Sequence, residues 1–409
     1  MTISRWVVAV ALCAACHTTP PAPVSAGLPL APPATLGFDS AALARVADYV
    51  SSQVDSAYPG AVVVVGRHGR LALLTAAGHY GTSDPRPVEP STVYDMASLT
   101  KVIGLTTACM ILVDEGRLDL DAPVQRYLPE FRGPDKDRVT IRHLLTHSSG
   151  LPAWRPLFRE AHDRRSVLAL VDTTPLDTVP GARFVYSDLG AIVLMQVVER
   201  ITGERIDHYL QRVEFGPLDM PSTRYLPPRA WRTRIAPTEI DTAFRHRLIR
   251  GEVHDENAGR MGGVSGHAGL FSNALDLARF ADWLLESVRR EEPADSVSQA
   301  GPRASCVVLC FRPGLLAEFV RRQGIPPGST RALGWDTPSD SGYSSAGSKL
   351  SRRSFGHTGF TGTSIWMDPD RDLFVILLTN RVNPTRANTK LLHVRAVVAD
   401  LVAAAVVGP

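Results

Sequence analysis

The stretch Ser98-Leu99-Thr100-Lys101 begins an apolar segment that continues to Val113 and is followed by Gly116. Residues three apart on a helix lie on one face, about a turn from each other, so the serine and lysine side chains meet if this segment is helical. A serine hydroxyl is a weak nucleophile until a base takes its proton, and lysine can be that base when burial and nearby positive charge lower its pKa. The stretch therefore predicts a buried central helix that begins with a nucleophile and its base, and that Gly116 closes.

Lysine is rare in this chain. Lysine and arginine together number 44, but only four of these residues are lysines, namely Lys101, Lys136, Lys349 and Lys390. Arginine stays protonated in proteins and cannot act as a base, so each lysine is a candidate for a task that a guanidinium group cannot perform. Only Lys101 has a serine three residues before it. A Ser-x-x-Lys pair is a weak signal when it stands alone, because roughly one chain in four of this composition holds one by chance.

The composition excludes several classes of protein. The chain has 409 residues, 44% of them hydrophobic and 21% charged, with a net charge of +3 at pH 7. This length is enough for two or three domains with large cores. The small net charge and the absence of a basic run argue against a nucleic-acid partner, and the apolar content excludes disorder over most of the length.

The N-terminus has the pattern of an export signal. The apolar stretch from Trp6 to Ala15 is too short to span a bilayer but has the length of a secretory signal core. Cys16 follows two small residues, as in bacterial lipoproteins, so we expect a signal peptide over residues 1–16 and lipidation of Cys16. Ordinary cleavage after Ala26 is the alternative. Residues 17–36 then form a Pro-rich tether, and the protein is expected in the periplasm or cell envelope, anchored to the membrane.

Three further cysteines are Cys109, Cys306 and Cys310. We expect buried thiols at these positions. The spacing of four between Cys306 and Cys310 also allows a disulfide, but it matches no zinc-binding pattern.

Strands are predicted near both ends of the chain, with helices between them. Residues 61–65 and 71–75 predict a β-hairpin with its turn at 68–69, and two more strands are predicted over 363–368 and 373–379. The clearest helices are predicted over 39–53, 193–201, 275–288, 315–322 and 385–407. This order predicts an α/β (α+β) fold. One sheet, flanked by helices, is built from residues 37–95 and 330–409, and a mostly helical domain of residues 96–329 is inserted between these parts.

Two further motifs follow the Ser-Lys pair along the chain. They are Tyr186-Ser187-Asp188 and, just before a predicted strand, His357-Thr358-Gly359. In this order the three motifs resemble the serine β-lactamase and penicillin-binding protein superfamily, specifically its class C β-lactamase-like branch. The resemblance runs from about residue 37 to residue 405 and includes residues 141–152, 251–258, 269–272 and 356–362. It implies a β-lactamase/transpeptidase-like fold with an antiparallel sheet.

The resemblance also implies roles for single residues. Ser98 attacks a carbonyl to form an acyl-enzyme, and Lys101 and Tyr186 share the proton transfer. The backbone N–H groups of Ser98 and Phe360 form the oxyanion hole. The remaining residues of the motifs bind substrate, and of these His357 and Thr358 hold its carboxylate or polar tail; the set is Asp188, His357, Thr358, Gly359 and Phe360. No cofactor is implied.

Two departures from the family pattern bear on the substrate. Asp188 stands where the family commonly has asparagine, and its charge would hold Lys101 protonated unless the carboxylate points away. His357 replaces the lysine typical of class C β-lactamases. Residues 251–258 resemble a sub-branch of periplasmic esterases and D-Ala-D-Ala carboxypeptidases. We therefore expect a carboxypeptidase- or esterase-like hydrolase acting on a peptidoglycan peptide or a small molecule, with a true β-lactamase as the alternative.

Functions of other classes have less support in the sequence. A catalytically inactive, wall-binding lipoprotein would not need Ser98, Lys101, Tyr186 and His357 together. The sequence around Ser265 lacks the Gly-x-Ser-x-Gly pattern of an α/β-hydrolase. A metal site built from His254, Asp255, Glu256 and His267 is conceivable, but loop residues that order the rim of an active site are the favoured interpretation. For His143 and His147 we expect structural hydrogen bonds rather than a metal. The oligomeric state stays open.

Overall fold

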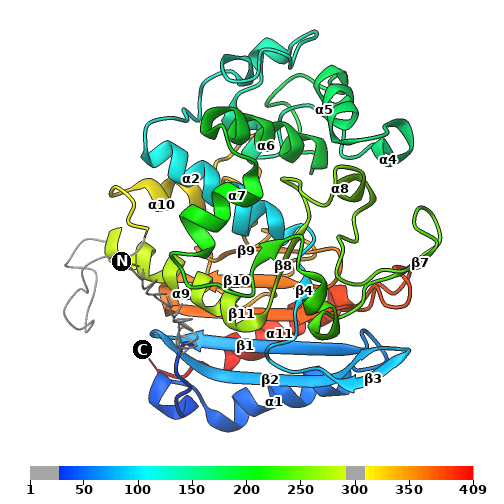
Figure 1. Cartoon of the computed structure of the whole chain (residues 1–409). Coiled ribbons are helices and arrows are strands. Elements are labelled where there is room, and N and C mark those ends of the chain that lie inside the picture. Colours follow the sequence, from blue (N-terminus) through cyan, green and yellow to red (C-terminus); the bar gives the residue numbers. More distant parts are fainter. Residues whose placement is uncertain (1–26, 292–308, 409) are drawn as a thin grey trace, which may run out of the picture.

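The structure, a computed structural model, describes residues 27–291 and 309–408. Residues 1–26, which include the expected signal peptide and Cys16, lie outside this part, so those assignments stay predictions. A six-stranded sheet fills the lower half of Figure 1, and most of the helices lie above it. All its neighbouring strands are antiparallel. The strands, in the sheet order β3-β2-β1-β11-β10-β9, are Asp84–Pro87, Arg70–Gly81, Gly60–Arg67, Leu373–Thr379, Ser364–Asp368 and Phe355–Thr358.

A strand from the first part of the chain pairs with a strand from its last part in the middle of this sheet. Strand β1 pairs with β11, from Ala61 opposite Thr379 to Arg67 opposite Leu373. The predicted hairpin and the predicted sheet from both ends are therefore confirmed. Strand β2 is longer than expected and continues to Gly81.

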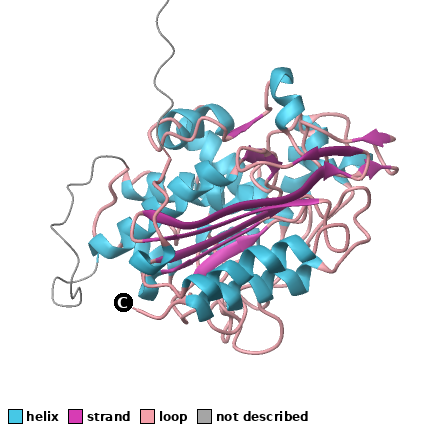
Figure 2. Cartoon of the chain, turned by 90° about the horizontal axis from the view of Figure 1, so that it is seen from below, coloured by secondary structure: helices cyan, strands magenta, loops and turns pink. Residues whose placement is uncertain are grey.

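Helices cover both faces of the sheet, so β1 and β11 are buried on both sides. Because successive side chains of a strand point to opposite faces, Val62 and Val64 pack into the larger core, whereas Val63 and Val65 pack into the smaller one. The smaller core is closed by two adjacent helices, α1 (Ser40–Ser52) and α11 (Leu391–Ala405). Figure 2 shows helices lying along one side of the sheet. The opposite face is covered by α9 (Ala274–Glu291), which the sequence placed within the helical domain.

The remaining described helices form the region above the sheet. They are α2 Thr107–Asp114, α3 Ile141–Leu145, α4 Leu157–Glu160, α5 Arg164–Thr173, α6 Asp188–Thr202, α7 Ile206–Leu210, α8 Glu256–Arg260 and α10 Leu315–Val320. Two small sheets accompany them. One contains β4 (Tyr94–Asp95), β8 (Leu270–Ser272) and β5 (Arg224–Tyr225), and the other pairs β6 (Ile240–Asp241) with β7 (Arg247–Leu248). The result is a mixed helical and antiparallel fold, as predicted.

The central helix is buried as expected, but its first turns are wider than those of an α-helix. Residues Lys101–Thr106 form a π-helix, α2 continues it, and every side chain from Lys101 to Val113 is buried. Gly116 follows with a φ of 68°, which suits the predicted helix end. The helix predicted over 193–201 begins earlier, at Asp188. Ser187 caps this helix, because its Oγ accepts the Gly190 N–H at 3.1 Å.

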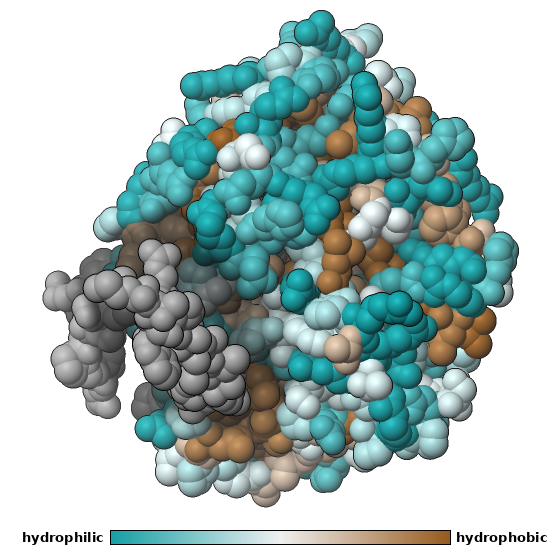
Figure 3. All heavy atoms as spheres, in the orientation of Figure 1, coloured by the Kyte–Doolittle hydropathy of each residue, from teal (hydrophilic) through white to brown (hydrophobic). Residues whose placement is uncertain are grey.

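Hydrophilic side chains cover most of the face seen in Figure 3. Within residues 27–291 and 309–408, no helix combines the length and the apolar character needed to cross a membrane. Cys109 is a buried free thiol, as expected. The expectation of a thiol was wrong for Cys310, which is disulfide-bonded. Cys306 lies outside the described residues.

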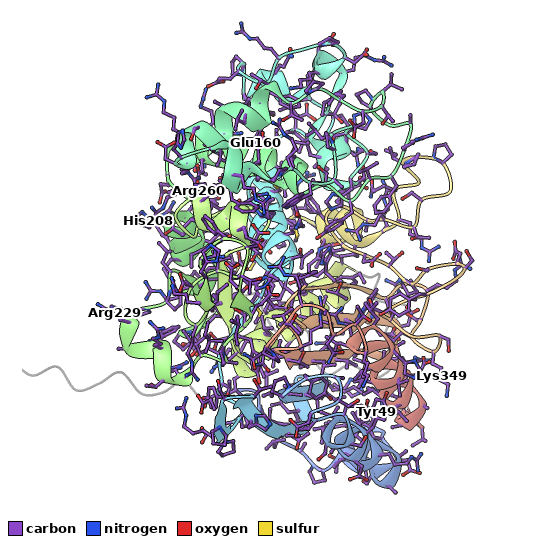
Figure 4. All side chains as sticks on the ribbon, turned by 90° about the vertical axis from the view of Figure 1, so that its right-hand side faces the viewer. Tyr49, Glu160, His208, Arg229, Arg260 and Lys349 are labelled. Atoms are coloured by element: carbon purple, nitrogen blue, oxygen red, sulfur yellow. The ribbon has the colours of Figure 1, made fainter. Side chains whose placement is uncertain are left out.

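Lys136 is a second buried lysine, with 1% of its surface exposed. Its Nζ donates a hydrogen bond to the backbone oxygen of Asp172 at 2.6 Å and lies 4.4 Å from the centre of the Phe131 ring. Burial lowers the pKa of Lys136 from 10.5 to about 8. The other two lysines, Lys349 and Lys390, are exposed, and Figure 4 shows Lys349 at the outer edge of the molecule.

Replacing Lys136 with methionine tests this burial. Between pH 8 and 10.5 the unfolded chain binds more protons at Lys136 than the folded chain does, so this residue makes stability rise with pH over that interval. We expect Lys136→Met to remove about 1 to 3 kcal/mol of this rise. The measurement is urea unfolding at several pH values, with the exposed Lys349→Met as the control. Equal pH dependence in all three proteins would contradict a buried, easily deprotonated lysine.

Candidate active site

Ser98 lies in a turn between β4 and the central helix. Ala97, the residue before it, has a φ of 45°, a left-handed conformation that residues with a side chain rarely adopt. The buried Asp95 carboxylate supports this turn, because it accepts the Ala97 N–H at 2.8 Å and the His254 N–H at 2.6 Å. The Ser98 N–H has no hydrogen-bond partner among the described residues. The turn therefore presents both the hydroxyl and the N–H of Ser98.

Lys101 lies beside Ser98, donates two hydrogen bonds and forms one ion pair. Its Nζ is 3.0 Å from Ser98 Oγ, 3.2 Å from the backbone oxygen of His267 and 2.7 Å from Asp188 Oδ1. An ammonium group has three N–H donors, whereas a neutral amine has two. Two donated hydrogen bonds and a carboxylate oxygen at 2.7 Å therefore match the protonated form of Lys101.

The electrostatics agree with this protonated form. Burial by itself would lower the pKa of Lys101, whose surface is only 3% exposed. The charge of Asp188 and the neighbouring Tyr186 outweigh burial, and the net effect raises the pKa above its ordinary value. A base role for Lys101 needed a lowered pKa, and the sequence also predicted that Asp188 would hold Lys101 protonated unless its carboxylate pointed away. The carboxylate points toward Lys101, so the second case applies.

Tyr186 and Asp188 reach the site from the start of α6. The Tyr186 ring centre lies 4.9 Å from Lys101 Nζ and 5.9 Å from the guanidinium carbon of Arg331. The Tyr186 hydroxyl is buried and has no hydrogen-bond partner among the described residues. Such a group is costly to bury unless it finds a partner during function. The Tyr186 ring therefore lies close to two cationic side chains, and its hydroxyl is left without a partner among the described residues.

The loop after β9 lies against the Ser98 turn. Thr361 Oγ1 donates to the backbone oxygen of Asp95 at 2.7 Å, and Thr363 Oγ1 donates to that of Met96 at 3.1 Å. Gly359 packs so closely that an added Cβ would lie 2.4 Å from the Met96 oxygen. The Phe360 N–H has no partner among the described residues. Two unpartnered N–H groups, on Ser98 and Phe360, thus come from adjoining segments, as an oxyanion hole requires.

His357 is a neutral histidine in this structure. Its Nδ1 lies 2.8 Å from the backbone oxygen of Thr358, so Nδ1 carries the proton and Nε2 is an acceptor. Burial, together with the charges of Arg331 and Lys101, holds the pKa of His357 well below its ordinary value. Nε2 is buried without a partner among the described residues. A neutral acceptor suits a donor group of a substrate better than the carboxylate expected from the sequence.

The residues considered for a metal site are engaged in other interactions. His254 Nε2 bonds to Glu239 at 2.9 Å, and Glu256 pairs with Arg386 at 2.7 Å. Ligand atoms of Asp188, Asp255 and His267 do lie within 4.8 Å of one another. However, Lys101 already neutralises Asp188, and His267 Nε2 bonds to Asp255 at 2.8 Å. Each of these residues thus contacts a neighbouring side chain, and their role in ordering the rim of the site stays a prediction.

Ser265, His267 and Asp255 form a hydrogen-bonded chain like that of a catalytic triad. Ser265 Oγ lies 2.8 Å from His267 Nδ1, and His267 Nε2 lies 2.8 Å from Asp255. Ser265 is completely buried, so a substrate does not reach its hydroxyl. These hydrogen bonds between Ser265, His267 and Asp255 instead support the His267 backbone oxygen, which accepts a hydrogen bond from Lys101.

Arg395 is a site residue that the sequence did not indicate. It lies on the C-terminal helix α11, is buried, and donates through Nη2 to the backbone oxygens of Gly359 at 2.6 Å and Thr363 at 2.8 Å. Burial lowers the pKa of Arg395 to about 10. Through its two hydrogen bonds Arg395 fixes both ends of the loop that carries the Phe360 N–H. A single cation among the apolar residues of that helix was the only signal for this role.

Comparison with known proteins identifies the family of the chain. The Beta-lactamase family model matches residues 46–400, and the chain belongs to this family of serine hydrolases. A protein of Salmonella agona (strain SL483) is 30% identical over 399 residues, which cover 89% of this chain and 88% of the relative. A protein of Salmonella schwarzengrund (strain CVM19633) is 31% identical over the same shares. Both carry the name "Putative D-alanyl-D-alanine carboxypeptidase".

Solved structures show the same fold. A class C β-lactamase superimposes with a TM-score of 0.69 at 18% identity, covering 90% of this chain and 98% of the other. EstCE1, a hydrolase with promiscuous acyltransferase activity, superimposes with a TM-score of 0.68 at 22% identity, covering 89% and 99%. At these identities the likeness concerns the fold alone, and the predicted fold class is confirmed.

Proposed function

We propose that this chain hydrolyses acyl substrates through an acyl-enzyme on Ser98, and that its substrate is a D-alanyl-D-alanine peptide of the peptidoglycan type. The observation that carries the proposal is the contact of Ser98 Oγ with the Lys101 ammonium, next to the unpartnered Tyr186 hydroxyl. The names of the relatives that are 30% and 31% identical support the choice of a carboxypeptidase.

In the proposed reaction Tyr186 acts in its phenolate form: Ser98 Oγ attacks the substrate carbonyl carbon, and its proton passes to the phenolate oxygen, which becomes a phenol. The protonated Lys101 does not accept this proton. Together with Arg331 it stabilises negative charge on Tyr186, while the N–H groups of Ser98 and Phe360 hold the oxyanion. The proton then moves to the leaving amine as the C–N bond breaks. Water attacks the Ser98 ester by the same route and releases the acid.

Esters are a second candidate substrate class, and His357 favours them. A D-alanine leaving group carries a carboxylate, which a cation would bind, whereas His357 presents a neutral, buried Nε2 acceptor. A neutral ester with a hydroxyl or amide donor fits that acceptor. Rates with a D-Ala-D-Ala peptide, a p-nitrophenyl ester and nitrocefin on the purified protein distinguish the classes. Turnover of nitrocefin far above the other two would identify a β-lactamase instead.

Covalent labelling tests the acyl-enzyme directly. We expect a fluorescent penicillin or an alkyl fluorophosphonate to label the wild-type protein and to leave Ser98→Ala unlabelled, because only Ser98 combines an accessible hydroxyl with the Lys101 contact. Ser91→Ala, a surface serine on the same segment, is the control and should label normally. A folded wild-type protein that no acylating probe labels would show that the chain is catalytically inactive.

Replacing Asp188 with asparagine separates the two roles that Lys101 could have. Without the Asp188 charge, burial dominates and the pKa of Lys101 falls. If the ammonium form is the active one, the alkaline limb of the pH profile of Asp188→Asn lies at lower pH than that of the wild type. The rate of this variant at neutral pH then falls roughly tenfold. If Lys101 is the base, the same variant becomes faster at neutral pH. The measurement is the pH profile of acylation, with the exposed Asp177→Asn as the control.

A further inference from the structure

His147 has a left-handed backbone conformation, which is unusual for a residue with a side chain. Its φ is 55°, in the left-handed region that residues other than glycine rarely occupy, and only 5% of its surface is exposed. The following loop is held firmly, because the Ser148 N–H donates to the His143 oxygen at 2.9 Å and the Gly181 N–H donates to the Ser148 oxygen at 2.7 Å. Strained residues of this kind persist where the surrounding contacts determine them, and they concentrate at functional sites.

Both the backbone and the side chain of His147 bind the segment that carries Tyr186. The His147 backbone oxygen accepts the Val185 N–H at 2.8 Å, and His147 Nδ1 accepts the Ser187 N–H at 3.1 Å. The two hydrogen bonds therefore flank Tyr186 in the sequence. Between them the imidazole packs on the phenol ring, with ring centres 4.5 Å apart and planes inclined by 40°. One histidine thus fixes the backbone on each side of Tyr186 and supports its ring.

The imidazole acts here as an acceptor and a packing surface. Because Nδ1 accepts a hydrogen bond, the ring proton is on Nε2. Burial, with the positive charges of Arg331 and Lys101, holds the pKa of His147 well below its ordinary value, so the ring stays neutral beside the site. His143 is occupied separately, since its Nδ1 accepts the Thr140 N–H at 3.2 Å. The structural roles expected for these two histidines therefore differ, and only His147 touches the candidate catalytic residues.

The position of the Tyr186 hydroxyl depends on these contacts. The hydroxyl itself has no hydrogen bond to any described residue, so the backbone and the packing of the ring determine where it points. The other neighbours of the ring are more distant: its centre lies 5.8 Å from that of His357 and 4.9 Å from Lys101 Nζ. Proton transfer requires heavy atoms within hydrogen-bond distance, so a small displacement of the phenol slows it strongly.

We propose that His147 is a positioning residue that acts through Tyr186, holding the phenol oxygen where it exchanges a proton with Ser98. This proposal rests on the proposed acyl-enzyme function. It predicts that His147 matters for the rate of acylation and not for substrate binding, and that its contribution disappears once the Tyr186 hydroxyl is gone.

Two substitutions of His147 separate its roles. Asparagine tolerates the left-handed conformation and offers a side-chain oxygen as acceptor, whereas glycine relieves the backbone but supplies neither acceptor nor ring. We expect His147→Gly to lower kcat for a p-nitrophenyl ester roughly thirtyfold with KM unchanged within about twofold, and His147→Asn to retain activity within roughly threefold of wild type. Thermal unfolding of each full-length variant checks the fold. If the glycine variant does not fold, His147→Ala replaces it, because alanine also lacks the acceptor and the ring.

A double-mutant cycle with Tyr186→Phe completes the test. In that background His147→Gly is expected to cause no further loss beyond about twofold, because the group it positions is absent. An equal loss in both backgrounds, or equal losses for asparagine and glycine in folded proteins, would overturn the positioning role. Labelling of wild-type Ser98 by a fluorescent penicillin or fluorophosphonate is measured first. Its absence overturns the proposed function, whereas normal labelling with an unimpaired His147→Gly overturns only the role of His147.

Discussion

Lys101→Arg is expected to slow acylation of Ser98 by roughly a thousandfold in a protein that still folds. The Lys101 ammonium is a compact group that reaches Ser98 Oγ, the His267 oxygen and Asp188 Oδ1 from one nitrogen. A guanidinium group is planar and spreads its donors over three nitrogens, so it cannot make the same three contacts in a space that leaves the lysine 3% exposed. It also cannot be deprotonated, so the prediction holds whether Lys101 acts as a cation or as a base.

The burst of a fluorescent penicillin or p-nitrophenyl ester measures this rate, and thermal unfolding shows whether the protein folds. Lys390→Arg is the matched control, because Lys390 is exposed and the substitution keeps the charge. Lys101→Gln, which is smaller, replaces the arginine variant if the larger side chain prevents folding. Normal acylation by either variant would remove Lys101 from the mechanism.

Tyr186→Phe is expected to lower the acylation rate by a factor of roughly a hundred to a thousand. The substitution removes a single oxygen, and that oxygen has no hydrogen bond to any described residue, so the cost to folding should be small. Because Asp188 favours the protonated form of Lys101, the proposed reaction assigns the Ser98 proton to the Tyr186 oxygen. The fall should therefore appear in kcat, with KM nearly unchanged.

Tyr49→Phe is the control for this substitution. Tyr49 lies on α1, far from the helical region, as Figure 4 shows. A Tyr186→Phe protein with wild-type acylation would assign the proton transfer to Lys101 and would require its ammonium to lose a proton despite Asp188. The Asp188→Asn pH profile would then show the faster reaction at neutral pH that a lysine base predicts.

Much of the fold followed from local patterns in the sequence. The short apolar runs of the strands and the longer apolar segment after Ser98 located the sheet and the buried helix, because continuous apolar residues indicate elements that are covered on all sides. The contact of α9 with the sheet could not be predicted this way. Its apolar face, like that of any amphipathic helix, shows that something covers it but does not show which surface does.

In the candidate site, too, some contacts could be predicted from the sequence and others could not. The contact between Ser98 and Lys101 could be predicted, because a spacing of three on one helix brings two side chains together whatever the rest of the chain does. The support from Arg395 and His147 could not, because each reaches a segment far away in the sequence. Asp188 was recognised as a departure, but only the structure shows that it points at Lys101.

The sequence by itself predicted which residues carry the chemistry, and it singled out Lys101 among four lysines. The tertiary structure places a carboxylate beside that lysine and so favours its protonated form. A pKa depends on the balance between burial and the charges that the fold brings within a few ångströms, and here a carboxylate at 2.7 Å outweighs burial. Lys136, also buried but without such a carboxylate contact, has a lowered pKa, so two lysines of one chain diverge only because of what the fold places beside them.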